Sequence, residues 1–292
     1  MNGLTFGRFT PYNTFVHRLD ARNKLFLTIA LIVAIFFRFS NWGTIIVFTV
    51  GYILLLILMM IFSKTSFIGF LKGLRGMWLL ALFLFVIYIF IPNPNYTMDV
   101  AFKIGSYKVR WDAFYYSGYI IIRLMMIMGL MMVLTSTTSP MNLTYAFEWY
   151  LTPLKVIKFP VHEIAMTLSI ALRFIPTLLE ETDRIMKAQS SRGVDFNHGG
   201  LFKRFRALTS LIIPLFVSAI ERSEELADAM EARGYDPKSK RTRYRKLKFS
   251  WMDLLVFVLI IGVVAGTIYT FVYDMNVEHI DLMYRWFHVL IK

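Results

Sequence analysis

The chain of 292 residues has no cysteine and few charged residues, which make up 17% of the sequence. Without cysteine, the protein has no disulfide scaffold, no thiolate metal site and no cysteine nucleophile. Globular proteins carry about 25% charged residues. Here hydrophobic residues reach 57%, and many of them gather in long apolar runs. Such runs predict a polytopic membrane protein.

Sequence motifs for nucleotide binding and catalysis are also absent. No Gly-x-x-x-x-Gly-Lys-Ser/Thr phosphate loop occurs, which excludes that manner of binding ATP. No metal-ligand spacing is present, and no nucleophile stands near a base. We therefore expect no catalytic site, no metal site and no cofactor held by this chain itself.

Five apolar segments are long enough to cross a bilayer, which takes about 20 helical residues. They cover residues 23–39, 42–62, 75–92, 113–134 and 252–273. The sequence therefore predicts an all-α polytopic membrane protein with about five transmembrane helices.

Charged residues are distributed unevenly around these spans. Residues 1–24 hold four basic and one acidic residue, 63–76 hold three basic and no acidic residue, and 135–250 hold 18 basic and 12 acidic residues. Because cytoplasmic loops carry an excess of lysine and arginine, all three segments, and with them the N-terminus, are predicted to be cytoplasmic. We expect a membrane region at 1–134 with four spans, a helical cytoplasmic region at 135–250, and a last span with an outer tail at 251–292.

The predicted cytoplasmic region contains two long helices, at about 161–191 and 201–232. A proline, Pro176 or Pro214, is predicted to interrupt each of them. Their first halves are apolar almost all round, which is typical of helices buried in a core or at a membrane interface.

Both long helices end in the pattern Ala-x-x-x-Arg-Gly-x-Asp, at residues 188–195 and 229–236. Glycine is favoured just past a helix end and arginine complements the helix dipole, so one copy alone would indicate helix termination. Two matched copies favour a second interpretation. In it, each helix presents the planar, multi-donor fork of an arginine to one of two similar partners.

Two further groups of basic residues stand out. Seven cations lie between Lys238 and Lys248, and we predict that Lys240, Arg241, Arg243 and Arg245 face anionic lipid at the cytoplasmic surface. A nucleic-acid partner is not expected beside an apolar span. Arg123 lies inside the fourth span, where a functional charge, snorkelling to the interface and pairing between helices all remain open.

Four ordered motifs spread over nearly the whole chain are Leu19-Asp-Ala-Arg-Asn-Lys-Leu25, Thr135-Ser-Thr-Thr-Ser-Pro140, and the stretches from Ala171 to Phe196 and from Pro214 to Tyr235. Together they resemble the transmembrane scaffold family of energy-coupling-factor (ECF) vitamin transporters, the EcfT or CbiQ-like family. The chain departs from the family pattern at Ala21, where proline is usual, and at Ser191, where alanine is frequent.

The resemblance implies an L-shaped, non-catalytic subunit in the plasma membrane of a prokaryote. It would couple ATP hydrolysis by two ABC-type ATPase subunits, which bind ATP and Mg²⁺, to movement of an exchangeable vitamin- or metal-binding membrane subunit. The implied ATPase-docking residues are Ser191, Arg192, Gly193, Ala232, Arg233 and Gly234. The apolar first halves of the long helices are predicted to receive the substrate-binding subunit through Leu168, Leu172, Leu211 and Leu215.

Two other functions remain open from the residues. A non-ABC membrane scaffold or channel would use residues 135–250 to bind a regulatory protein. Intramembrane CAAX-type proteases have a glutamate pair followed by an arginine, and a similar group occurs here at Glu180, Glu181 and Arg184. The spacing is one residue shorter than in the motif of that family. Ion pairing between residues three or four positions apart on one helix explains these residues more simply.

Overall fold

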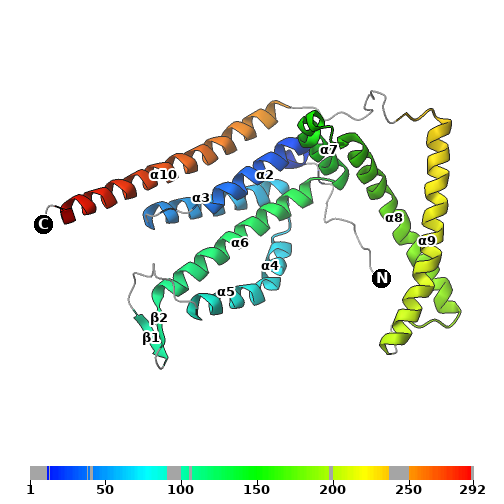
Figure 1. Ribbon diagram of the computed structural model, residues 1–292, viewed down its shortest axis with the longest axis horizontal. Helices are drawn as coiled ribbons and strands as arrows, with labels where there is room; N and C mark the ends of the chain where they lie inside the picture. The colour runs from blue at the N-terminus through cyan, green and yellow to red at the C-terminus, as the bar shows by residue number, and fades with distance from the viewer. Residues whose placement is uncertain are drawn as a thin grey trace. The chain divides into compact units, whose positions relative to one another are not determined.

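The computed structural model describes residues 12, 14–37, 39, 42–90, 100–104, 107–196, 200–236 and 250–290 of the chain. The chain divides into two units, one that combines residues 1–139 with 247–292 and one that spans residues 140–246. We name them the membrane unit and the α7–α9 unit. The described helices of the two units confirm the prediction of an all-α polytopic membrane protein (Figure 1).

The described part of the membrane unit contains helices and one short hairpin. The helices are α1 (Phe15–Arg18), α2 (Ala21–Phe36), α3 (Trp42–Ser63), α4 (Phe67–Gly76), α5 (Trp78–Phe90), α6 (Trp111–Thr137) and α10 (Trp251–Leu290). The hairpin pairs β1 (Val100–Ile104) with β2 (Tyr107–Arg110) in antiparallel fashion, with a register irregularity between Val100 and Phe102. The sequence of β2 alternates apolar and basic residues, which is the pattern of a strand, and the hairpin was not expected from the hydropathy of the spans.

Three predicted spans coincide with single helices that are long and apolar enough to cross a bilayer. These are Gly43–Ser63 of α3, Ala113–Thr137 of α6 and Trp251–Tyr273 of α10, with mean hydropathies of 3.0, 2.0 and 2.6. In α8 of the other unit, Val161–Ser191 also meets this criterion of length and composition, at a mean hydropathy of only 1.2.

The other two predicted spans differ from straight membrane helices. The segment predicted at 75–92 overlaps two helices, α4 and α5, which are bent by 47° relative to each other. With 10 and 13 residues, neither helix is long enough to cross alone, and the bent pair fits either one broken span or a re-entrant loop. Helix α2 has 16 residues, so it is about 24 Å long at 1.5 Å per residue. It is shorter than the hydrocarbon core, which is about 30 Å thick.

Helix α2 nevertheless lies at the centre of the membrane unit. It packs against both α6 and α10, and Leu31 on α2 is fully buried. The buried core gathers side chains from five helices: Leu27, Leu31, Ala34 and Ile35 of α2, Tyr52, Leu56 and Met60 of α3, Phe70 of α4, Met126, Leu130 and Val133 of α6, and Ile260 of α10. Close packing of this cluster explains why a short helix is retained within the membrane unit.

The α7–α9 unit consists of α7 (Pro140–Leu151), the 3₁₀ turn η1 (Thr152–Ile157), α8 (Val161–Ser191) and α9 (Leu201–Ala232). Helices α8 and α9 pack as an antiparallel pair that cross each other (Figure 1). Both continue without a break through Pro176 and Pro214, so the predicted interruptions are wrong. A proline removes one backbone hydrogen bond, and the many bonds on either side hold a helix of more than 30 residues together.

Candidate functional site

Helix α8 ends in a well-defined backbone turn at the first Arg-Gly pattern. The N–H of Gly193 donates to the carbonyl of Ser190, at 3.0 Å. The next N–H, that of Val194, donates to the carbonyl of Gln189, at 3.1 Å. These two bonds form a Schellman motif, which places its central residue in the left-handed region that glycine tolerates best. Gly193 accordingly has a φ of +86°.

Helix α9 ends in the same turn. The N–H of Gly234 donates to Glu231, at 2.8 Å, and the N–H of Tyr235 to Met230, at 3.0 Å. Gly234 has a φ of +69°. The preceding arginine has φ and ψ of −90° and 12°, against −88° and 9° for Arg192 in α8. Helix termination therefore accounts for both glycines, in the same geometry.

The turn geometry requires the glycines, whereas the arginine side chains contribute to helix termination only through the helix dipole. All six residues predicted to dock ATPases are exposed: Ser191, Arg192, Gly193, Ala232, Arg233 and Gly234. Neither Arg192 nor Arg233 forms an ion pair with another residue in the described part of the chain. Each guanidinium, with its five N–H donors, is thus available to acceptor groups on another molecule.

The two Arg-Gly turns lie at opposite ends of the antiparallel pair, because each closes the C-terminus of its own helix (Figure 1). Helix α9 has 32 residues, which corresponds to a length of about 48 Å. Two turns so far apart can each receive a separate protein without competition for the same space.

An ion pair connects α8 to α9 between these ends. The Arg222 Nη2 lies 2.5 Å from Glu181 Oε2, and both side chains are partly buried. Because a charged hydrogen bond at such a site resists separation, it restrains how the two helices slide past each other. Glu181, one of the residues similar to the protease motif, is thereby assigned to helix pairing.

Helix α9 exposes a continuous apolar face over its first two-thirds. The exposed side chains are three or four residues apart, with two adjacent pairs: Phe202, Phe205, Leu208, Ile212, Ile213, Phe216, Val217 and Ile220. This spacing places them on one side of the helix. A soluble protein rarely leaves so large an apolar patch uncovered. We name this set of residues the α9 apolar face.

The leucines predicted to dock the substrate-binding subunit differ in exposure. Leu168 on α8 is exposed, and Leu172 and Leu215 are half-buried. Leu211 is only 9% exposed and shares the buried side of α9 with Ala207, one turn away. We therefore correct Leu211 from a surface residue to a packing residue, since its neighbours Ile212 and Ile213 occupy the exposed side.

The basic residues predicted to face lipid, Lys240, Arg241, Arg243 and Arg245, lie outside the described residues. No group of three or more histidine, aspartate or glutamate side chains in the described ranges is arranged to hold a metal ion.

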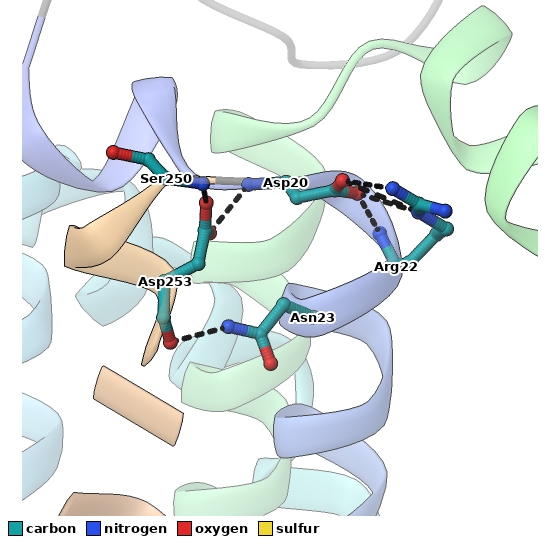
Figure 2. A network of polar contacts seen from close by, with 5 residues as sticks. All are labelled: Asp20, Arg22, Asn23, Ser250 and Asp253. Atoms are coloured by element: carbon teal, nitrogen blue, oxygen red, sulfur yellow. Dashed lines mark hydrogen bonds and ion pairs between the residues drawn. The ribbon is translucent and has the colours of Figure 1, made fainter. Parts of the chain in front are cut away.

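Sequence reasoning missed the central role of Asp253 at the start of α10, where its side chain is fully buried (Figure 2). One carboxylate oxygen accepts the backbone N–H of Asp20, and the other accepts that of Ser250, both at 2.8 Å. Asp20 and Ser250 immediately precede α2 and α10, so one carboxylate ties together the N-termini of two helices. The pattern Ser250-Trp-Met-Asp253, with an acid three residues after a capping serine, was the sequence signal available.

The motif that begins at Leu19 surrounds this carboxylate. Asp20 caps α2 by accepting the N–H of Arg22, and its carboxylate pairs with the Arg22 guanidinium at 2.7 Å. The amide of Asn23 donates to the backbone carbonyl of Asp253, at 2.8 Å. Lys24 donates to the carbonyl of Thr137, the last residue of α6, at 3.0 Å. Figure 2 shows the contacts between the starts of α2 and α10. With the bond from Lys24 to Thr137, this short segment holds three helix ends of the membrane unit together.

Arg123 pairs helices within the membrane unit. Its guanidinium donates to the carbonyl of Phe37, which follows the end of α2, and to the hydroxyl of Tyr119. It also lies 4.4 Å from the centroid of the Tyr119 ring. These residues line a cavity of about 10 Å³, the space of roughly one water molecule. Of the three interpretations left open by the sequence, the structure favours pairing between α6 and the end of α2.

Comparison with known proteins gives consistent matches. A family model for CbiQ, described as cobalt transport protein, matches residues 12–244. The energy-coupling factor transporter transmembrane protein EcfT of Bacillus subtilis is 41% identical over 268 residues, covering 91% of this chain and 97% of the relative. EcfT of Brevibacillus brevis is 42% identical over 268 residues, which cover 91% of this chain and 98% of the relative. EcfT of Lactococcus lactis is 40% identical over 264 residues, which cover 89% of this chain and 95% of the relative.

Proposed function

The chain belongs to the CbiQ family of membrane transport proteins, and we propose that it is the scaffold and transducer subunit of an energy-coupling-factor importer. Two ABC-type ATPases bind and hydrolyse ATP with Mg²⁺ and dock on the two Arg-Gly turns. Their movement passes along α8 and α9 to an exchangeable vitamin- or metal-binding membrane subunit. This chain itself performs no catalysis and holds no cofactor or nucleic acid.

The observation that carries this proposal is the matched pair of helix ends. Both α8 and α9 close with the same Schellman turn and leave an exposed arginine at the tip. A duplicated device at opposite ends of a helix pair suits two similar partners, as in an importer driven by two ATPases. The ion pair between Glu181 and Arg222 would transmit the displacement of one tip to the other helix.

The orientation follows from the charges. The N-terminus and the α7–α9 unit are proposed to be cytoplasmic, in the plasma membrane of a prokaryote, because three segments rich in lysine and arginine then lie on that side. ATP is found in this compartment, so the Arg-Gly turns face the side on which ATPases work.

The composition of the purified complex tests the proposal. Native mass spectrometry of the chain purified by an affinity tag should give one copy of this chain with two ATPase subunits and one substrate-binding subunit. A complex that lacks ATPases but contains another soluble protein would contradict the proposal and favour a non-ABC scaffold. The variant with both Arg192 and Arg233 changed to alanine serves as the matched negative control.

The α9 apolar face is proposed to receive the substrate-binding subunit, since that subunit must leave and return and packing contacts are easily remade. Changing Ile212 to aspartate should reduce capture of this subunit at least about tenfold, because a charge is introduced into an apolar contact. The ATPases should stay bound, and the thermal stability of the chain should change little, since Ile212 is exposed.

The neighbouring variant Leu211→Asp provides the comparison. Leu211 is buried, so a charge there should lower the thermal stability and cause the loss of all partners together. If Ile212→Asp behaved like Leu211→Asp, or if it left subunit capture unchanged, the α9 apolar face would not be the docking surface.

A further inference from the structure

The turn between α7 and α8 has no part in the proposed function, yet it is strongly apolar and exposed. Leu154, Val156, Ile157 and Phe159 are all exposed, Val156 at 89% and Ile157 at 75%. Lys155 and Lys158 alternate with these side chains and are exposed as well. We name residues 154–159 the α7–α8 turn. Four uncovered apolar side chains on six consecutive residues require a surrounding other than water.

The backbone of this turn presents a lysine where glycine is favoured. The N–H of Lys158 donates to Lys155, at 3.0 Å, and the N–H of Phe159 to Leu154, at 3.3 Å. Lys158 lies in the left-handed region, with a φ of 60°. A residue other than glycine is uncommon there. The hydrogen bonds follow the same scheme as in the Arg-Gly turns, with lysine in the place of glycine.

In the described part of the chain, one other lysine takes the left-handed conformation in a turn of this kind. Lys64, with a φ of 52°, follows Ser63 at the end of α3, and the N–H of Thr65 donates to the carbonyl of Met60, at 3.1 Å. Because α3 is a candidate membrane span, Lys64 lies where a span reaches the membrane surface. A lysine at this position places its charge beside lipid head groups, as expected for residues that flank a span.

The α7–α8 turn is within reach of the bilayer. The span α6 ends at Thr137, and η1 begins at Thr152. Helix α7 has 12 residues and is therefore about 18 Å long. The two residues before it add at most about 7 Å. The covalent chain thus keeps Thr152 within about 25 Å of the end of a membrane helix, by the same two estimates.

The charge and the aromatic residues in and before the α7–α8 turn indicate which kind of surface it would contact. The sequence from Trp149 to Phe159 holds two lysines and no acidic residue. Trp149 is 50% exposed, and its ring lies 5.0 Å from that of Tyr150, centroid to centroid. Tryptophan and tyrosine concentrate at the level of lipid head groups, and lysine is attracted to anionic lipid.

We propose that the α7–α8 turn binds an anionic phospholipid surface, with its apolar side chains in the outer acyl region and Lys155 and Lys158 on the phosphates. An apolar face rimmed by lysine and tryptophan is the composition of interfacial membrane segments. The turn gives the α7–α9 unit an attachment to the bilayer in addition to its connection to α6. It does not depend on the identity of the proteins that bind the Arg-Gly turns.

Site-directed spin labelling tests this attachment, and the chain has no native cysteine to remove. A nitroxide is placed on Val156→Cys in the full chain, purified with its copurifying subunits and again without them. The protein is reconstituted in nanodiscs of phosphatidylcholine alone and of phosphatidylcholine with one-third phosphatidylglycerol. In the anionic discs the label should become more accessible to oxygen than to a polar nickel chelate. Ala227 is exposed in the charged half of α9. A label on Ala227→Cys should therefore stay accessible to the chelate in both kinds of nanodisc.

Charge-reversal variants test whether insertion of the label depends on the lysines of the α7–α8 turn or on the overall charge of the chain. Lys155→Glu should lower the ratio of inserted to water-exposed label by at least about fivefold, because the contribution of one lysine is lost and the new carboxylate is repelled by the anionic surface. The same reversal at the exposed Lys187 on α8 should leave that ratio unchanged. A label that remained in water in both lipids, or that inserted equally with and without phosphatidylglycerol, would overturn the proposal. Shielding only in the presence of other subunits would overturn it in favour of a protein partner.

Discussion

Replacing Arg192 and Arg233 together by alanine should abolish ATP-driven uptake while the chain stays folded. Both guanidinium groups are exposed at the tips of α8 and α9, so their removal leaves no cavity and no unpaired internal partner. In the proposed complex each arginine would be part of a buried interface, where the loss of a charged, multi-donor contact costs about 2–5 kcal/mol. Two such losses should dissociate the ATPases or uncouple them from transport.

Three measurements on the double variant separate these effects: substrate uptake into cells or vesicles, copurification of ATPases, and thermal stability of the chain. Single variants should retain partial assembly, since one turn remains intact. Lysine at both positions should rescue only in part, because it lacks the planar fork of arginine. Arg173→Ala, at an exposed arginine elsewhere on α8, is the matched control and should transport normally. Normal uptake by the double variant would refute ATPase docking at the Arg-Gly turns.

Replacing Asp253 by alanine should cause the largest loss of stability in the membrane unit. Its carboxylate accepts the backbone N–H groups of Asp20 and Ser250, and it is fully buried. A buried donor without an acceptor costs about 1–3 kcal/mol. The Asp20 bond is buried and the Ser250 bond is partly buried, so losing both should cost roughly 2–4 kcal/mol. The thermal unfolding temperature in detergent should fall by on the order of 10 °C.

Two further variants test whether the stability depends on the buried carboxylate of Asp253 rather than on the loss of any negative charge. Asp253→Asn keeps one acceptor oxygen and should lose roughly half as much stability as the alanine variant. Asp228→Ala removes an exposed carboxylate on α9 and should leave the unfolding temperature within about 1 °C, as is usual for surface changes. An unfolding temperature unchanged in Asp253→Ala would show that this carboxylate does not hold α2 and α10 together.

The two predictions concern residues of opposite kinds. Arg192 and Arg233 are exposed and are proposed to bind other molecules, so their variants should lose function before stability. Asp253 is buried and acts only within the chain, so its variant should lose stability first. This contrast lets the same assays of uptake, assembly and unfolding test the site and the fold independently.

Local patterns in the sequence were sufficient for much of the architecture. The long helices predicted at 161–191 and 201–232 coincide with α8 and α9, because periodicity and capping residues act between neighbours in the chain. The matched Arg-Gly ends were also visible, since a Schellman turn is set by the few residues around its glycine. Apolar runs of about 20 residues likewise indicated α3, α6 and α10.

Other features were decided only by the tertiary structure. Asp253 accepts an N–H from a residue 233 positions away, and Arg123 donates to Phe37 across 86 positions. No periodicity or propensity relates such distant residues, because their contact exists only once the helices have packed. Leu211 and Ile212 are equally apolar neighbours, yet one is buried and the other exposed. Which side of α9 meets α8 depends on the packing of the pair, and this choice determines which apolar residues remain for a partner.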